Sequence, residues 1–260
     1  MSETLKNSQN CRILVTNDDG IYAPGIKVLR KIAEQLSSDV WVVAPAVEQS
    51  GAAHSLTLRR PLQVGQIAER QFFVDGTPTD CVLIAVNQIL RDKKPDIVLS
   101  GVNRGTNIGE DITYSGTIAA AMESALLGIP SIALSQMRDK EHNIDWQVAE
   151  HYGPIVVNKL FQMDWSPSTL INVNFPNCNS KDVKGIRVVR QGRRASTIQV
   201  ASITDPLGRP YLWIGDFTNN QSADPDTDLS AIHDQAISIT PLHLDLTHEL
   251  SLKKLKGIFS

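Results

Sequence analysis

Two adjacent carboxylates follow the first apolar run of the chain, in the stretch "CRILVTNDDG". Residues 12–16 are apolar and β-branched and predict a buried strand, so Asp18 and Asp19 stand where that strand ends. Neighbouring carboxylates stay ionised together only when they are well solvated or when a cation lies between them. Their hard oxygen atoms favour Mg²⁺, Mn²⁺ or Ca²⁺ over zinc. Taken alone, this dipeptide favours a solvated acidic turn over a metal site.

Polar residues also follow two other predicted strands. Their positions favour a metal site over a solvated acidic turn. Residues 40–45 run into "APAVEQSG", which places Ser50 in the next loop. The strand "PDIVLSG" runs into "VNRGTNIGEDITYSGT", which holds Asn103 and Asn107. Ligands of open α/β sheets bind beyond the carboxyl ends of the strands. We therefore expect these side chains to share one edge of a sheet with the acidic pair.

The same glycine-rich stretch ends in Ser115, Gly116 and Thr117 at the predicted start of a helix. Glycines let backbone N–H groups approach a bound anion, and a helix N-terminus favours negative charge. The alternative is an irregular loop in which Ser115 or Thr117 only caps the helix. A simple cap does not require a long polar, glycine-rich segment before it, so this pattern favours an anion-binding site.

Known phosphate-binding motifs do not fit these loops. The long loop lacks the Lys of G-x-x-x-x-G-K-[ST], and "NDDG" lacks the glycines of a dinucleotide fold. A cation beside an anion-binding turn is what the hydrolysis of a phosphate ester requires, because the metal polarises the phosphoryl oxygen and lowers the pKa of water.

Three alternatives come from other classes of protein. A phosphate-receiver switch needs a phosphorylatable Asp where Ser100 and Gly101 stand, and haloacid-dehalogenase phosphatases need D-x-D rather than adjacent aspartates. A non-catalytic sensor that binds metal and nucleotide stays open, because its ligands would look the same as those of an enzyme.

The elements that must position these residues alternate between strand and helix. Apolar spacing predicts helices and strands in turn up to "LINVNFP" at 170–176. Such alternation predicts an α/β fold with three Rossmann-like layers, a mostly parallel sheet with helices on both faces. The stretch 52–70 interrupts this rhythm and is interpreted as a small β insertion.

The character of the sequence changes after about residue 177. We interpret residues 11–177 as the catalytic core and 178–260 as a β-rich extension that returns to the core and contributes to oligomer contacts. Arg193 and Arg194 within it are expected in a solvated turn. The last segment, "ELSLKKLKGIF", predicts an amphipathic helix for packing or subunit contact.

Composition excludes several classes of function. The 260 residues are 42% hydrophobic and carry a net charge of −3, with no region basic enough for duplex nucleic acid. No apolar run reaches the ~18 residues that span a bilayer. Three distant cysteines, Cys11, Cys81 and Cys178, argue against a disulfide framework. The polar first ten residues do not resemble a signal peptide, so the expected location is the cytoplasm.

The chain resembles one known family over nearly all of residues 11–177. The strings "ILVTNDDGIYAPGI", "VVAPAVEQSG", "GTPTDCV", "DIVLSGVNRGTNIGEDITYSGTIAAAMES" and "INVNFP" are similar, in this order, to those of the stationary-phase survival protein SurE family. "DTDLSAIHDQAISITPL" adds a weaker match in the C-terminal part. The departure is Asp234-Gln235-Ala236, which stands where the family has Gly-Tyr.

The resemblance implies metal ligands at four positions: Asp18, Asp19, Ser50 and Asn103. These would hold one divalent cation per subunit, Mg²⁺ or Mn²⁺. It also implies that Asn107 and the turn Ser115–Gly116–Thr117 face the phosphate.

By the same resemblance, the expected activity is metal-dependent hydrolysis of nucleoside 5′- and 3′-monophosphates, with short polyphosphate as a further substrate. Water is the simplest nucleophile, with Asp18 or Asp19 as the catalytic group that orients it or accepts its proton. An aspartyl-phosphate is less natural because both carboxylates are committed to the metal. The family forms homodimers or homotetramers.

Overall fold

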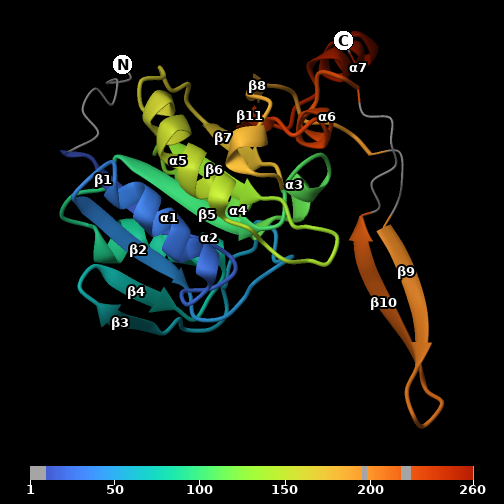
Figure 1. The fold of residues 1–260 in the computed structure, drawn as a ribbon, viewed down its shortest axis with the longest axis horizontal. Coiled ribbons are helices and arrows are strands. Elements are labelled where there is room, and N and C mark those ends of the chain that lie inside the picture. The colour runs from blue at the N-terminus through green and yellow to red at the C-terminus, as the bar shows by residue number, and fades with distance from the viewer. Residues whose placement is uncertain (1–9, 195–197, 218–223, 260) are drawn as a thin grey trace.

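The computed structural model describes residues 10–194, 198–217 and 224–259. Nine strands of these segments form one sheet, which is the centre of the molecule (Figure 1). In spatial order they are β3 (Val64–Ala68), β4 (Gln71–Val74), β2 (Asp39–Pro45), β1 (Arg12–Thr16), β5 (Ile97–Arg104), β6 (Ser131–Gln136), β7 (Thr169–Phe175), β11 (Ile237–His243) and β8 (Ile186–Val188).

The six strands from β4 to β7 run parallel, as their register pairs show. β3 adds an antiparallel edge beside β4, and β11 is antiparallel to β7. After β1 the chain moves to one side of the sheet through β2 and β4, and β5 then returns to the other side of β1. The carboxyl ends of β1 and β5 therefore form the topological switch point, where open α/β sheets bind ligands.

Helices cover both faces of this sheet. α1 (Pro24–Glu34) and α5 (Gln147–Leu160) pack on one face, and α2 (Pro78–Ile84) and α4 (Gly116–Leu126) pack on the other. The predicted three-layer α/β architecture is thus confirmed. α1 forms because Ile26, Leu29 and Ile32 recur at helical spacing and are all buried. Pro24 fits its first turn, which needs no backbone donor there.

The C-terminal extension joins the core sheet and also leaves it. β8 and β11 extend the sheet beyond β7, so two strands from residues 178–260 lie in the central sheet. β9 (Ile198–Thr204) and β10 (Pro210–Phe217) form an antiparallel hairpin that projects from the body (Figure 1). α6 (Asp228–His233) precedes β11, and α7 (Glu249–Phe259) is the expected C-terminal helix.

Some local expectations need correction. In the predicted β insertion over 52–70, strand structure is limited to β3, because the chain before Val64 forms turns and extended loop. α2 does not continue as a regular α-helix, since a π-helical turn follows it at Ala85–Ile89. No described helix is both long and apolar enough to cross a lipid bilayer.

α1 packs very closely on the sheet, and this predicts a specific cost for one substitution. A Cβ on Gly25 would overlap the Val102 carbonyl oxygen and lie 3.1 Å from the Trp146 ring. Gly25→Ala should therefore lower the free energy of unfolding by about 1–3 kcal/mol, the usual cost of overpacking. Urea denaturation followed by circular dichroism measures the change.

The control is Gly257→Ala in α7, where an added Cβ meets nothing within 4 Å. It should leave stability unchanged or raise it by up to ~1 kcal/mol through helix propensity. Equal midpoints for wild type and Gly25→Ala would contradict the close packing of α1.

Candidate active site

Asp18 lies at the centre of the candidate site, directly beyond the end of β1. Its residue is only 4% exposed, and its Oδ1 accepts a hydrogen bond of 2.5 Å from Thr117 Oγ1. Its backbone oxygen accepts one of 2.8 Å from the Gln49 N–H. Residues from the loop after β2 and from the start of α4 thus meet at the end of β1. The first carboxylate of the pair is therefore fixed in place and shielded from water.

The electrostatics of the pair are unfavourable without a counter-charge. Burial raises the pKa of Asp18 to about 6, and the charge of Asp19 acts in the same direction, while the bond from Thr117 opposes it. Burial also raises the pKa of Asp19, against the hydrogen bond that the Arg104 N–H donates to it. The negative charge of Glu48 adds to the rise at Asp19. A cation at this position would relieve the repulsion.

Of the two other predicted metal ligands, Asn103 lies near the end of β5 and Ser50 lies in the turn after β2. The Arg104 N–H donates to Asp19 Oδ2 at 3.2 Å, which brings the end of β5, and hence Asn103, beside the acidic pair. Asn103 Nδ2 donates to the Gly105 carbonyl at 2.8 Å, so the amide nitrogen is engaged and the amide oxygen is the atom that could bind a cation. Ser50 is exposed, and its hydroxyl donates to Glu48 Oε1 at 2.8 Å.

The predicted anion-binding turn faces the acidic pair. A Cβ on Gly116 would lie 2.7 Å from Asp18 Cβ, so only glycine lets the first turn of α4 approach so closely. Ser115 does cap this helix, since its Oγ accepts from the Ile118 N–H at 3.1 Å. The capping role considered as the alternative is therefore real. It also aims the positive N-terminus of α4 at the carboxylates.

Asn107 is held from the neighbouring strands rather than from the acidic pair. Its Nδ2 donates to Ser135 Oγ at 2.9 Å, and its backbone N–H donates to Asn174 Oδ1 at 2.8 Å. The Asn172 amide donates to the Asn107 carbonyl at 2.8 Å. Sequence reasoning missed these three partners. Asn172 and Asn174 carried a signal, because two asparagines on one face of a buried strand need polar neighbours.

The donor set fits a hard divalent cation. The four predicted ligands offer two carboxylates, a hydroxyl and an amide, all of them oxygen donors. The described residues contain no group of three or more His, Cys, Asp or Glu side chains arranged as a metal site. Beneath the pair, Asn17 Oδ1 is buried and has no partner among the described residues.

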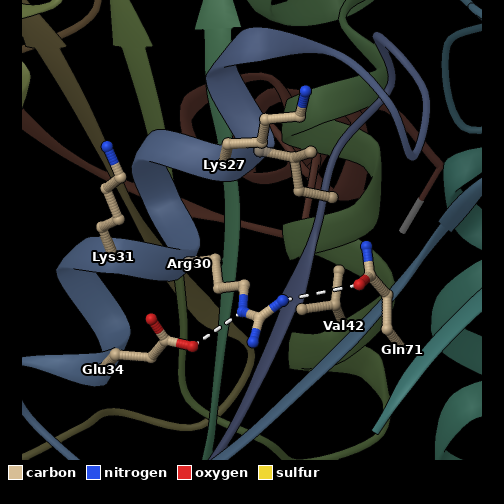
Figure 2. A pocket seen from close by; sticks show the side chains of 7 residues that line it. Lys27, Arg30, Lys31, Glu34, Val42 and Gln71 are labelled. Atoms are coloured by element: carbon tan, nitrogen blue, oxygen red, sulfur yellow. Dashed lines mark hydrogen bonds and ion pairs between the residues drawn. The ribbon is translucent and has the colours of Figure 1, made fainter. Parts of the chain in front are cut away.

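A separate groove of about 370 Å³ lies between α1 and the strands β2 and β4 (Figure 2). Its lining includes Lys27, Arg30 and Lys31, and Arg30 pairs with Glu34 at 2.7 Å and with Gln71 at 3.4 Å. None of the predicted site residues belongs to the described lining. The carboxyl end of the sheet is therefore the better candidate for the reaction.

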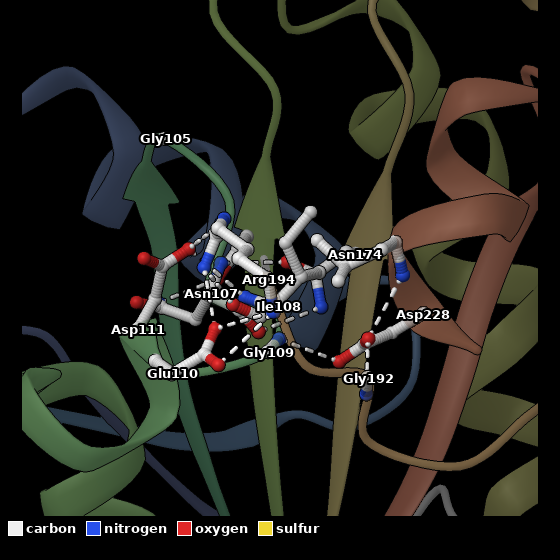
Figure 3. Close-up of polar contacts among 12 residues, drawn as sticks. Gly105, Asn107, Ile108, Gly109, Glu110, Asp111, Asn174, Gly192, Arg194 and Asp228 are labelled. Carbon is white, nitrogen blue, oxygen red and sulfur yellow. Dashed lines mark hydrogen bonds and ion pairs between the residues drawn. The ribbon is translucent and has the colours of Figure 1, made fainter. Parts of the chain in front are cut away.

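One expectation about a charged side chain is wrong. Arg194 was expected in a solvated turn, but it is 9% exposed and pairs with Asp111 at 2.7 Å and with Glu110 at 3.5 Å (Figure 3). A guanidinium is buried only where several acceptors surround it, and the loop before α3 (Asp111–Tyr114) supplies them.

Fold and site together define a doubly wound α/β protein with two adjacent carboxylates beside a helix N-terminus at the switch point of its sheet. The family model described as Survival protein SurE matches residues 13–197. The chain belongs to the SurE family.

Curated relatives agree over almost the whole length. The chain is 54% identical to 5′-nucleotidase SurE of Paramagnetospirillum magneticum, over 95% of each chain. It is 53% identical to 5′-nucleotidase SurE of Erythrobacter litoralis, over 91% of this chain and 94% of that one. The crystal structure of the SurE protein from Aquifex aeolicus superimposes with a TM-score of 0.85 at 43% identity, covering 96% of this chain and all of the other.

The buried charge of Asp18 predicts an unusual pH dependence of stability in metal-free protein. The folded state holds this proton up to about pH 6, whereas the unfolded chain loses it near 3.8. The free energy of unfolding should therefore fall as pH rises from about 4 to above 6, by up to about 3 kcal/mol. Asp18→Asn should reduce this fall in urea titrations with EDTA, while Asp19, Asp111 and Asp228, whose pKa values burial also raises, keep their share.

The exposed carboxylate of Asp75, paired with Arg60 at 3.0 Å, supplies the control. Asp75→Asn should change the free energy of unfolding by no more than about 1 kcal/mol, because its ion pair is exposed. Parallel profiles for wild type and Asp18→Asn would show that the Asp18 carboxylate carries no such cost.

Proposed function

We propose that this protein is a metal-dependent phosphomonoesterase that hydrolyses nucleoside 5′- and 3′-monophosphates, with short polyphosphate as a further substrate. The observation that carries the proposal is the pair of the buried Asp18 and the half-buried Asp19, with Asp18 facing the N-terminus of α4. Two negative charges beside a helix N-terminus suit a cation and a phosphate together. The names of the curated relatives, 5′-nucleotidase SurE, support the same activity.

In this proposal the metal ligands are Asp18, Asp19, Ser50 and Asn103, and they hold one Mg²⁺ or Mn²⁺ per subunit. When bound, the cation polarises a phosphoryl oxygen and offsets the charge of the phosphate. The four ligands come from the ends of β1 and β5 and from the loop after β2, which the sheet holds rigidly. Such fixed oxygen atoms need little reorganisation during the reaction.

The chain's own groups bind the other phosphoryl oxygens. The backbone N–H groups of Gly116 and Thr117 lie in the first turn of α4, where N–H groups need acceptors outside the helix. The Thr117 N–H already acts on the Asp18 carboxylate and lowers its pKa, so it would be shared between Asp18 and the phosphate. The Ser115 hydroxyl accepts from Ile118, and its own proton is then available to a phosphoryl oxygen. Asn107 contributes an amide that Ser135 orients.

Water attacks phosphorus, the ester P–O bond breaks, and the leaving oxygen takes a proton from solvent. Asp19 is the better acceptor of the proton from the attacking water, because it is only half-buried and Asp18 is bound to Thr117. The groups at the N-terminus of α4 stabilise the charge that builds up on the phosphoryl oxygens.

A sensor that binds metal and nucleotide without turnover is the second candidate function. The observation that favours the sensor is the same Asp18–Asp19 pair, because these carboxylates can bind a cation whether or not a reaction follows. Turnover measured beside binding separates the sensor from the enzyme.

We further propose that the protein works as a homodimer or homotetramer through its extension. On β10, Leu212 and Ile214 lie on one face of the hairpin and Trp213 on the other, and each is at least 66% exposed. An isolated two-stranded hairpin is at best marginally stable in water. A second copy of the chain that covers both faces accounts for these exposed residues.

The proposed activity is tested by phosphate release from a panel of 5′- and 3′-nucleoside monophosphates and short polyphosphate, with Mn²⁺, Mg²⁺ or EDTA. Wild type should release phosphate only with metal. Asp18→Asn should lose at least about 100-fold in kcat/KM and bind Mn²⁺ more weakly, because a first ligand is removed. Asp75→Asn should behave as wild type.

If nucleotide and Mn²⁺ bind but no substrate is turned over, the sensor replaces the enzyme. If Asp18→Asn retains near-normal activity at ordinary metal concentrations, the ligand assignment is wrong.

The proposed assembly is tested by light scattering of the full chain. Trp213→Lys should lower the measured mass toward that of a monomer, because a charge cannot be buried in an apolar interface. Leu126→Lys changes a residue that is 59% exposed at the end of α4, and it should leave the mass unchanged. A monomeric wild type, or an unchanged mass in Trp213→Lys, would exclude the hairpin as the interface.

A further inference from the structure

The loop between Asn107 and Ser115 is held by side chains of the C-terminal extension. At its centre is Gly109, a buried residue with a φ of +57°. The Gly109 N–H donates to Asp228 Oδ2 at 2.9 Å (Figure 3). The Gly109 carbonyl accepts from Gln191 Nε2 at 2.8 Å. Buried backbone groups need partners, and both groups of Gly109 find them more than 80 residues away.

The Asp228 carboxylate binds backbone N–H groups, and one of these groups belongs to Gly109. Asp228 is fully buried, at 0% exposure, and stands at the start of α6. Its carboxylate accepts the N–H groups of Gly109, Gly192 and Leu229, the last two at 2.8 Å each. A carboxylate with three such donors joins three segments of backbone at one point. No amide or hydroxyl of similar size accepts as many hydrogen bonds.

Arg194 holds the next part of the same loop. Its side chain is only 5% exposed, and Nη2 donates to Asp111 Oδ2 at 2.7 Å while Nη1 donates to the Ile108 carbonyl at 2.9 Å. Its backbone N–H donates to the Glu110 carboxylate at 3.0 Å. Asp111 is the first residue of α3, so this guanidinium fixes where that short helix begins. We call Gln191, Arg194 and Asp228 the extension latch.

The latched loop connects the two halves of the phosphate site. Asn107, at one end, is anchored on β6 and β7 by Ser135 and Asn174. Ser115, at the other end, is the C-cap of α3 and the N-cap of α4. A shift of α3 would therefore move the Ser115 turn relative to Asn107. Small displacements of this kind cost catalysis much more than they cost folding.

We propose that Gln191, Arg194 and Asp228 are positioning residues that set the geometry between Asn107 and the Ser115–Gly116–Thr117 turn. This inference rests on the proposed function, which assigns the phosphate to these two groups. Gln191, Arg194 and Asp228 hold Ile108, Gly109 and Asp111, none of which is a proposed metal ligand. The latch should therefore govern phosphate handling and leave cation binding unaffected.

The test uses the full chain with Asp228→Asn. The amide presents an N–H where one of the three donors points, so at least one backbone group loses its acceptor. We expect kcat for a nucleoside monophosphate to fall at least tenfold and the inhibition constant of inorganic phosphate to rise. The Mn²⁺ dissociation constant, measured by calorimetry, should stay within twofold. Loss of overall structure would weaken Mn²⁺ and phosphate binding together.

The matched control is Asp226→Asn, two residues earlier. Asp226 forms an exposed pair with Arg190 at 3.5 Å, and its side chain is 65% exposed. It should match wild type in every measurement. If Asp228→Asn does not fold, Gln191→Ala removes one hydrogen bond to Gly109 from an exposed residue and should give a several-fold fall in kcat with the same Mn²⁺ affinity.

A failure of the latch and a failure of the proposed function give different results. If wild type turns over nucleotides and folded Asp228→Asn or Gln191→Ala keeps kcat and phosphate inhibition within twofold, the latch is overturned and the nucleotidase stands. If wild type turns over no substrate, the proposed activity fails. The latch is then decided by calorimetry with Mn²⁺ and inorganic phosphate, where weaker phosphate binding in Asp228→Asn supports it and equal binding overturns it.

Discussion

Asp18 is buried beneath the first turn of α4, with a second carboxylate next to it in sequence and in space. Removing a carboxylate from water costs free energy, and the charge of Asp19 increases that cost. The fold meets this cost only in part, through the Thr117 hydroxyl and the positive end of α4. Other features of the site follow from the need to bring further positive charge and oxygen donors to this point.

The sheet meets that need through its strand order. Because β1 lies beside β5 at the switch point, the acidic pair and Asn103 emerge together although they are about eighty residues apart. Small residues then permit close approach of the covering elements. Gly116 lets α4 reach Asp18, and Gly25 lets α1 rest on the Val102 carbonyl. The site is therefore rigid because the packing on both faces of the sheet leaves its residues little space to move.

The division into a catalytic core and an extension describes the sequence better than it describes the molecule. The extension supplies two strands to the central sheet and a buried Asp and Arg to the loop beside the site. Its hairpin leaves the body between Arg194 and Asp228, so the proposed interface with a second copy and the proposed latch belong to one stretch of chain. Changes in this extension are thus expected to reach the phosphate site through backbone contacts.

The sequence by itself determined the α/β architecture and the group of residues at the carboxyl end of the sheet. Apolar spacing reports which face of a helix or strand is buried, and parallel strands bring their ends to a common edge. Only the tertiary structure decided that Arg194 is buried, that Asn172 and Asn174 hold Asn107, and that Asp228 binds Gly109. These contacts join residues 65 to 119 positions apart. Side-chain periodicity reports only which face of a local element is buried. It does not identify partners so far apart in sequence, because these residues come into contact only in the folded chain.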